Sequence, residues 1–184
     1  YGDFKESDAR RALRIFNEKS NTIDIKRTDA FDLKILEQSK SEEIQYIGKL
    51  SVNNSCFYRE YVLGNDTPEM RATSLVIGQA LQQPFFTEMR TNQQLGYIVW
   101  SYTRNRDDTY YLSFVIQSGA FTADDVNQRA DDFIASTPKL LSAMDKETYQ
   151  QLKESAIEKL EKKPMSIGER ANKFQTFIFE HDAD

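Results

Sequence analysis

The sequence has very few residues of the kinds that form disulfides or bind zinc. Its 184 residues include one cysteine and one histidine. A single cysteine, Cys56, cannot form an internal disulfide, and we interpret it as a small buried side chain. A catalytic zinc site takes about three protein ligands, and we interpret His181 as part of an exposed tail rather than a ligand cluster. We therefore expect this chain to bind no metal and not to be a zinc enzyme by itself.

The sequence also lacks a surplus of basic residues and a long apolar run. Its 24 Lys and Arg stand against 29 Asp and Glu, and the resulting net charge of −5 argues against a nucleic-acid-binding protein. No apolar run approaches the ~18–20 residues of a transmembrane helix, and no basic and apolar leader opens the chain. Because the chain begins abruptly, we interpret it as a fragment. The 39% hydrophobic and 29% charged residues suit a globular domain, and 12 Phe and 9 Tyr predict an aromatic core.

The N-terminal part is predicted to be separate from the main domain. Ser7 can cap a helix that runs to about Asn17, with small and apolar residues at helical spacing. Residues 18–43 are rich in Lys, Asp, Glu and Ser and lack a clear period, which is typical of a linker. The sequence is therefore divided into residues 1–17, a linker at 18–43, and a main domain at 44–184.

Four segments of the main domain are predicted to be strands because they are rich in β-branched and aromatic residues. They are residues 44–50, 55–63, 96–102 and 110–117. The polar residues 103–108 between the last two are a plausible hairpin connection. A helix separates the two strand pairs, and further helices follow them. This order predicts an α+β fold, with an antiparallel sheet and helices packed on one of its faces.

Capping residues mark where the helices of the main domain begin. They are Thr67, Thr122, Asp145 and Ser166. Two prolines are expected to disturb these helices because proline lacks a backbone N–H. Pro84 should interrupt the first helix, and Pro138 should kink or divide the second.

The most specific stretch of the sequence runs from Phe85 to Ser101. It is predicted to be a short helix that ends near Thr91, followed by a turn and an apolar strand. Gly96 should supply the backbone freedom that this reversal needs. Arg90 then lies at the helix end and Tyr97 at the mouth of the strand, so both side chains can reach one cleft at the edge of the sheet. Taken alone, the pair also fits ordinary packing, with Arg90 at the helix terminus and Tyr97 in the core.

This stretch resembles the signature of the pitrilysin and insulin-degrading-enzyme family of zinc metallopeptidases, the inverzincins. The resemblance is to their C-terminal half, which does not hold the metal. The matching residues are Pro84, Phe86, Met89, Arg90, Thr91, Gln94, Leu95, Gly96, Tyr97 and Val99. The resemblance implies that residues 1–17 are the end of a preceding domain. It also implies that residues 44–184 are a C-terminal peptidase-family domain, like that of the mitochondrial processing peptidases and incomplete at its C-terminus.

The resemblance also implies roles for three residues. In the family, an Arg and a Tyr of this signature face the zinc that the other half holds. Tyr97 would donate a hydrogen bond to the scissile carbonyl oxygen as it becomes an oxyanion. Arg90 would hold a carbonyl or carboxylate of the bound peptide. Phe86 would line an apolar subsite, and core packing is an equally good interpretation of it.

The function that follows from the resemblance belongs to a larger protein. The chain would complete the substrate chamber of a zinc metalloendopeptidase that hydrolyses peptides. Zn²⁺ would be held by the N-terminal catalytic half of the same polypeptide, because the family's H-x-x-E-H motif needs two histidines and this chain has one. The fragment alone is therefore expected to be inactive. Its partners would be that half and peptide substrates, with no nucleic acid and no membrane span.

Two alternatives remain at this level. One is a catalytically dead scaffold or assembly domain of the same fold, and the other is a free-standing peptide-binding module. The intact Arg90 and Tyr97 favour an active parent protein. The family includes periplasmic and cytoplasmic members, so the resemblance assigns no compartment.

Overall fold

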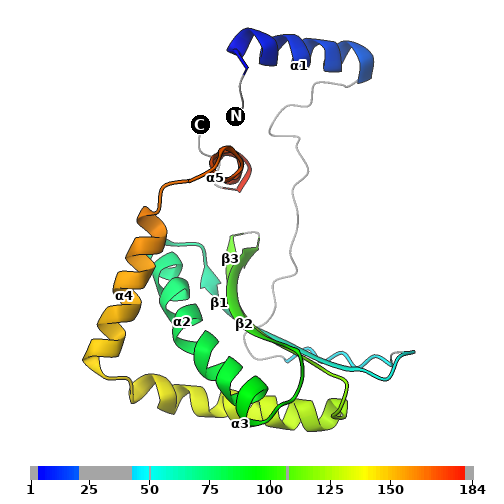
Figure 1. Cartoon of the computed structure of the whole chain (residues 1–184), viewed down its shortest axis with the longest axis vertical. Helices are drawn as coiled ribbons and strands as arrows, with labels where there is room; N and C mark the ends of the chain where they lie inside the picture. Colours follow the sequence, from blue (N-terminus) through cyan, green and yellow to red (C-terminus); the bar gives the residue numbers. More distant parts are fainter. Residues whose placement is uncertain (1–3, 21–42, 50, 107, 181–184) are drawn as a thin grey trace. The chain divides into compact units, whose positions relative to one another are not determined.

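The computed structural model describes residues 4–20, 43–49, 51–106 and 108–180. The chain divides into two units, one made of Tyr1–Lys40 with Lys163–Asp184 and the other of Ser41–Lys162. In the described part, the first unit contains the helices α1 (Glu6–Ser20) and α5 (Ile167–Glu180). The elements of the second unit, drawn in Figure 1, are β1 (Ser55–Asn65), α2 (Pro68–Phe86), the π-helix η2 (Thr87–Asn92), β2 (Ile98–Arg106), β3 (Thr109–Ser118), α3 (Ala123–Ser142) and α4 (Lys146–Glu161).

The second unit is built on a three-stranded antiparallel sheet in which β3 lies between β1 and β2. Three of the four predicted strands are confirmed, each within a few residues of its predicted ends. The prediction of a strand at 44–50 is wrong, since the described residues 43–49 form no strand. Tyr46 and Ile47 are 91% and 80% exposed. An extended apolar segment is stabilised only where a neighbouring strand or a core covers it.

An aromatic cluster forms the centre of the core. Phe114 of β3 lies with its ring centroid 5.0 Å from that of Phe85 on α2 and 6.5 Å from that of Phe133 on α3. The rings of Phe85 and Phe133 are 5.2 Å apart. Because both helices contact the same side chain of the central strand, they cover the same face of the sheet. The predicted α+β fold, with helices on one face of an antiparallel sheet, is confirmed.

The predicted helix starts in the second unit are confirmed by their capping hydrogen bonds. The hydroxyl oxygens of Thr67 and Thr122 accept from the backbone N–H groups of Met70 and Asp125. The carboxylate of Asp145 accepts from the N–H of Thr148 at 2.7 Å, and this hydrogen bond lowers the pKa of Asp145. Each of these side chains satisfies an N–H that has no partner inside its own helix.

Both proline predictions are corrected in part. Pro84 lies inside α2 and does not interrupt it, because α2 continues to Phe86 and passes directly into η2. A proline inside a helix costs about 3 kcal/mol, and the burial of Leu81 before it and Phe85 after it acts against this cost. Pro138 lies inside α3 and does not divide it.

Two further predictions differ from the structure. Cys56 is exposed rather than buried, at the start of the edge strand β1. Ser7 does not cap α1, because α1 begins at Glu6 and the backbone N–H of Lys5 donates to the carboxylate of Asp8 instead.

The remaining helix start is confirmed, and α5 begins after Ser166, whose hydroxyl oxygen accepts from the N–H of Glu169. The carboxylate of Glu169 accepts in turn from the N–H of Met165.

None of the described helices is long and apolar enough to cross a membrane.

The adjacent residues Phe85 and Phe86 provide a matched test of the core. Phe85 is fully buried among aromatic rings, whereas Phe86 is 37% exposed. Large-to-small substitutions at fully buried aromatic positions leave a cavity that the surroundings fill only in part. We therefore expect Phe85→Ala to lower the free energy of unfolding by about 3–5 kcal/mol, at least ~2 kcal/mol more than Phe86→Ala. Urea unfolding of the two variants measures this difference, and equal losses would contradict the core described here.

Candidate functional site

The helix that carries Arg90 ends in a π-helical turn. Over η2 the backbone widens, and the N–H of Gln93 bonds to the carbonyl of Glu88, five residues before it, at 2.9 Å. Such turns are rare and occur often at functional sites. The wide turn buries Met89 completely and leaves the next residue, Arg90, partly exposed.

A tight turn leads from η2 into β2. Gln94 adopts a left-handed conformation with φ of 53°, and the N–H of the buried Leu95 bonds back to the carbonyl of Met89 at 2.9 Å. The predicted role of Gly96 is corrected here, because among the described glycines only Gly64 has a positive φ. Gly96 is needed for close approach instead. A Cβ at this position would lie 1.8 Å from the carbonyl oxygen of Gln117 on β3.

Arg90 and Tyr97 lie together, as the sequence predicted. The guanidinium of Arg90 donates through Nη1 to the carbonyl oxygen of Gly96, and its Cζ lies 4.7 Å from the centre of the Tyr97 ring. A cation over an aromatic face is attracted to it, by about 0.5–1 kcal/mol at an exposed site. Tyr97 is nevertheless 84% exposed. The guanidinium lies over its ring, and most of the side chain is exposed.

Phe86 is the third residue singled out from the sequence. It is the last residue of α2 and is 37% exposed, unlike its buried neighbour Phe85. The ring pairs among the described residues do not include Phe86 with Tyr97. The structure thus brings Arg90 and Tyr97 into contact, and it places Phe86 at the helix end that leads into the same turn.

The sequence did not point to a second set of residues that supports this turn. The side chain of Glu88 accepts from Asn92 at 2.7 Å and from Gln93 at 2.8 Å. These hydrogen bonds, that of Gln93 first, lower the pKa of Glu88. Gln93 in turn accepts from Nη1 of Arg129 on α3 at 3.1 Å. Residues 88 and 92 have the spacing of a helical pair, whereas nothing in the sequence connects Gln93 with Arg129.

The described residues offer no place for a metal. Within the ranges given above, no three or more His, Cys, Asp or Glu side chains are grouped so that they could hold an ion. The predicted tail residue His181 lies outside the described residues.

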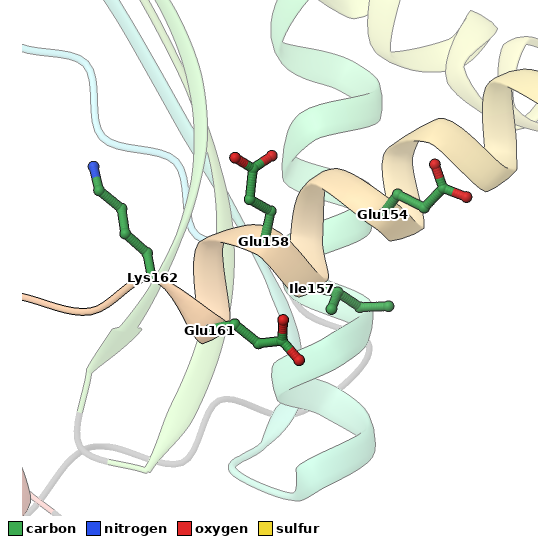
Figure 2. Close-up of a pocket in the computed structure, with 5 residues that line it drawn as sticks. All are labelled: Glu154, Ile157, Glu158, Glu161 and Lys162. Carbon is green, nitrogen blue, oxygen red and sulfur yellow. The ribbon is translucent and has the colours of Figure 1, made fainter.

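A surface hollow elsewhere on the second unit is lined by residues at the end of α4. Figure 2 shows these residues, which are Glu154, Ile157, Glu158, Glu161 and Lys162. The side chain of Glu158 points to the opposite side of the helix from those of Ile157 and Glu161 (Figure 2). Because four of the five come from α4, Lys162 directly follows it and the side chains do not converge, we assign no chemistry to this hollow.

Comparison with known proteins identifies the family. Residues 76–175 match the model of the PQQ synthase PqqF-like family, C-terminal lobe domain 4. The chain belongs to this family. The match covers more than half of the chain and includes the whole stretch from Phe86 to Tyr97. The resemblance to the C-terminal half of an insulinase-like peptidase is thereby confirmed.

Individual relatives agree with this assignment. The chain is 28% identical to Protease 3 of Salmonella typhi over 111 residues, which are 60% of this chain and 12% of that protein. It is 27% identical to the A-factor-processing enzyme of Saccharomyces cerevisiae over 126 residues, 68% of this chain and 12% of that protein. The crystal structure of pitrilysin has the same fold, with a TM-score of 0.68 at 20% identity over 96% of this chain and 19% of that one.

The chain therefore spans about an eighth of the length of the curated relatives it matches. The relatives are named as a protease and a processing enzyme. The activity of a whole protein of this family is therefore only proposed for this chain.

The close approach at Gly96 gives a test of the geometry of the site. In Gly96→Ala, the new methyl group would overlap the backbone of Gln117, and β2 would have to move away from β3. We expect this variant to lose about 2 kcal/mol or more in free energy of unfolding. The control is Gly119→Ala, where a Cβ meets nothing within 4 Å, so unfolding should change by less than about 0.5 kcal/mol. Equal stability of the two variants in urea unfolding would contradict the packing described here.

Proposed function

We propose that this chain is part of a zinc metalloendopeptidase and completes its substrate chamber. Membership in the family and the names of the relatives support a peptidase domain. The observation that carries the proposal is the exposed Tyr97, whose ring lies against the guanidinium of Arg90. Peptide substrates and the N-terminal catalytic half of the same polypeptide would be the partners of this surface.

Tyr97 would act on the carbonyl oxygen of the scissile bond. Its exposed hydroxyl can donate a hydrogen bond, and its ring is restrained by the contact with Arg90. A donor that is already oriented stabilises the oxyanion of the transition state without reorganisation during the reaction, and such a donor contributes about 3 kcal/mol.

Arg90 would hold the peptide beside the reacting bond. A guanidinium has five N–H donors, and the hydrogen bond to Gly96 uses Nη1. Among the ion pairs of the described residues, none includes Arg90. Its charge can therefore act on a carbonyl or carboxylate of the substrate.

Phe86 would provide an apolar surface for a substrate side chain. It is exposed at the end of α2, just before the turn that carries Arg90. Its substitution is then expected to raise KM more than it lowers kcat, because such a contact is present in the ground state and the transition state alike.

The metal would belong to the other half of the protein. The described residues of this chain do not fit a zinc site, so metal binding and activation of water are assigned elsewhere. Zn²⁺ there would supply the polarisation of the carbonyl and the nucleophilic water, and this chain would supply hydrogen-bond donors.

A single substitution tests the role of Tyr97. In the full-length, zinc-loaded protein, Tyr97→Phe removes the hydroxyl and keeps the ring that packs on Arg90. We expect kcat on a fluorogenic peptide to fall by about 10²-fold. Tyr149→Phe, at a half-exposed tyrosine of α4, is the matched control and should have native kcat.

The other outcomes separate the alternatives. A native kcat in Tyr97→Phe would assign Tyr97 to packing and leave the protein a peptidase. A native protein that holds no zinc and cleaves no peptide would overturn the proposal, and the chain would then be a scaffold or assembly domain.

A further inference from the structure

The side chain of Gln93 connects the π-turn to a helix that is distant in the sequence. Its Oε1 accepts from Nη1 of Arg129 on α3, and its Nε2 donates to Oε1 of Glu88 in η2. Both hydrogen bonds are partly buried, at 3.1 and 2.8 Å. Arg129 is itself placed by a contact of its Cζ with the ring of Phe121, at 4.9 Å.

The chemistry of the partners fixes the orientation of the Gln93 amide. Arginine can only donate, and an ionised carboxylate can only accept. The amide therefore has one arrangement that satisfies both neighbours, with its oxygen toward Arg129 and its nitrogen toward Glu88. Asn92 donates to the second oxygen of Glu88 at 2.7 Å and holds that carboxylate in place.

The position of Gln93 affects the residues that follow it. The backbone N–H of Gln93 closes the π-turn on the carbonyl of Glu88, and the chain reaches Gly96 only three residues later. The carbonyl of Gly96 accepts from Arg90, and Tyr97 comes next with its ring against the same guanidinium. A displacement of Gln93 would therefore shift the Gly96 carbonyl and the Tyr97 ring relative to the guanidinium of Arg90.

We propose that Gln93 is a positioning residue, which acts through Arg129 and Glu88 to hold Arg90 and Tyr97 in the geometry that catalysis needs. This inference rests on the proposed function of Arg90 and Tyr97. Displacements of about 1 Å in groups remote from the chemistry can reduce rates by up to ~10²-fold. The hydrogen bonds of Gln93 to Glu88 and Arg129 are a means of preventing such a displacement.

Exchanging the hydrogen-bond donor and acceptor between residues 88 and 93 tests whether the hydrogen bonds of Gln93 hold the turn. Gln93→Glu still accepts from Arg129, but it places a carboxylate against the carboxylate of Glu88. The double variant E88Q/Q93E restores a donor and an acceptor in reversed positions, and the new amide oxygen at 88 can still accept from Asn92. Gln128→Glu is the matched control, since Gln128 donates to the carboxylate of Asp132 on the exposed face of α3 at 3.1 Å.

The activity of the full-length, zinc-loaded protein on a fluorogenic peptide is the first readout. We expect Q93E to lower kcat about tenfold or more, and E88Q/Q93E to return it to within about threefold of native. Q128E should have native kcat. Native kcat in Q93E, or no recovery in the double variant, would overturn the proposal.

Backbone hydrogen exchange of the same proteins is a readout that does not depend on activity. In Q93E, peptides that cover residues 87–97 should exchange faster, while those of β3 should exchange at the native rate. E88Q/Q93E should restore slow exchange in 87–97. If the native protein cleaves no peptide, the proposed function fails, and exchange still decides whether Gln93 holds the turn. Unchanged exchange in Q93E would overturn the positioning role in either case.

Discussion

The burial of three side chains around the π-turn is the constraint on which the rest of the site depends. Phe85, Met89 and Leu95 are each at most 1% exposed. They attach the end of α2, the π-helix η2 and the turn before β2 to one core. Each is followed closely by an exposed or partly exposed residue. These are Phe86, Arg90 and Tyr97, respectively. The core thus sets where the three candidate residues emerge, and a small change in the core would move all of them.

The backbone makes its own contribution to this arrangement. Gly96 allows the chain to approach β3 more closely than any other residue would, and Gln94 adopts the left-handed conformation of the turn. The carbonyl of Gly96 then becomes the acceptor for Arg90. In the described part of the chain, the guanidinium bonds to a backbone carbonyl and takes part in no ion pair, so its positive charge is positioned without being neutralised there.

Much of the fold could be predicted from local sequence signals. The caps at Thr67, Thr122 and Asp145 define helix starts through short-range hydrogen bonds, and these predictions were confirmed. The sequence predicted for a related reason that Arg90 and Tyr97 lie near each other, because a helix end and a strand start only seven positions apart lie close in space. Their direct contact is a finding of the structure. The strand predicted at 44–50 was wrong, since its formation depends on a partner that a local pattern does not reveal.

What could not be predicted depends on contacts between distant residues. Pro84 is tolerated inside α2 because of buried neighbours on both sides of it. The need for glycine at position 96 comes from the carbonyl of Gln117 on another strand. The bridge from Gln93 to Arg129 joins residues that are 36 positions apart. None of these three effects leaves a periodic or capping signal in the sequence.

In the proposed function, Tyr97 faces the reacting bond of a peptide. A crystal structure of the full-length, zinc-loaded protein with a non-hydrolysable peptide analogue tests it most directly. We expect the Tyr97 hydroxyl to lie about 3 Å from the oxygen that replaces the scissile carbonyl, with the ring still against Arg90. A bound analogue whose corresponding oxygen lies beyond hydrogen-bond distance of Tyr97, with another donor in its place, would contradict this role of Tyr97.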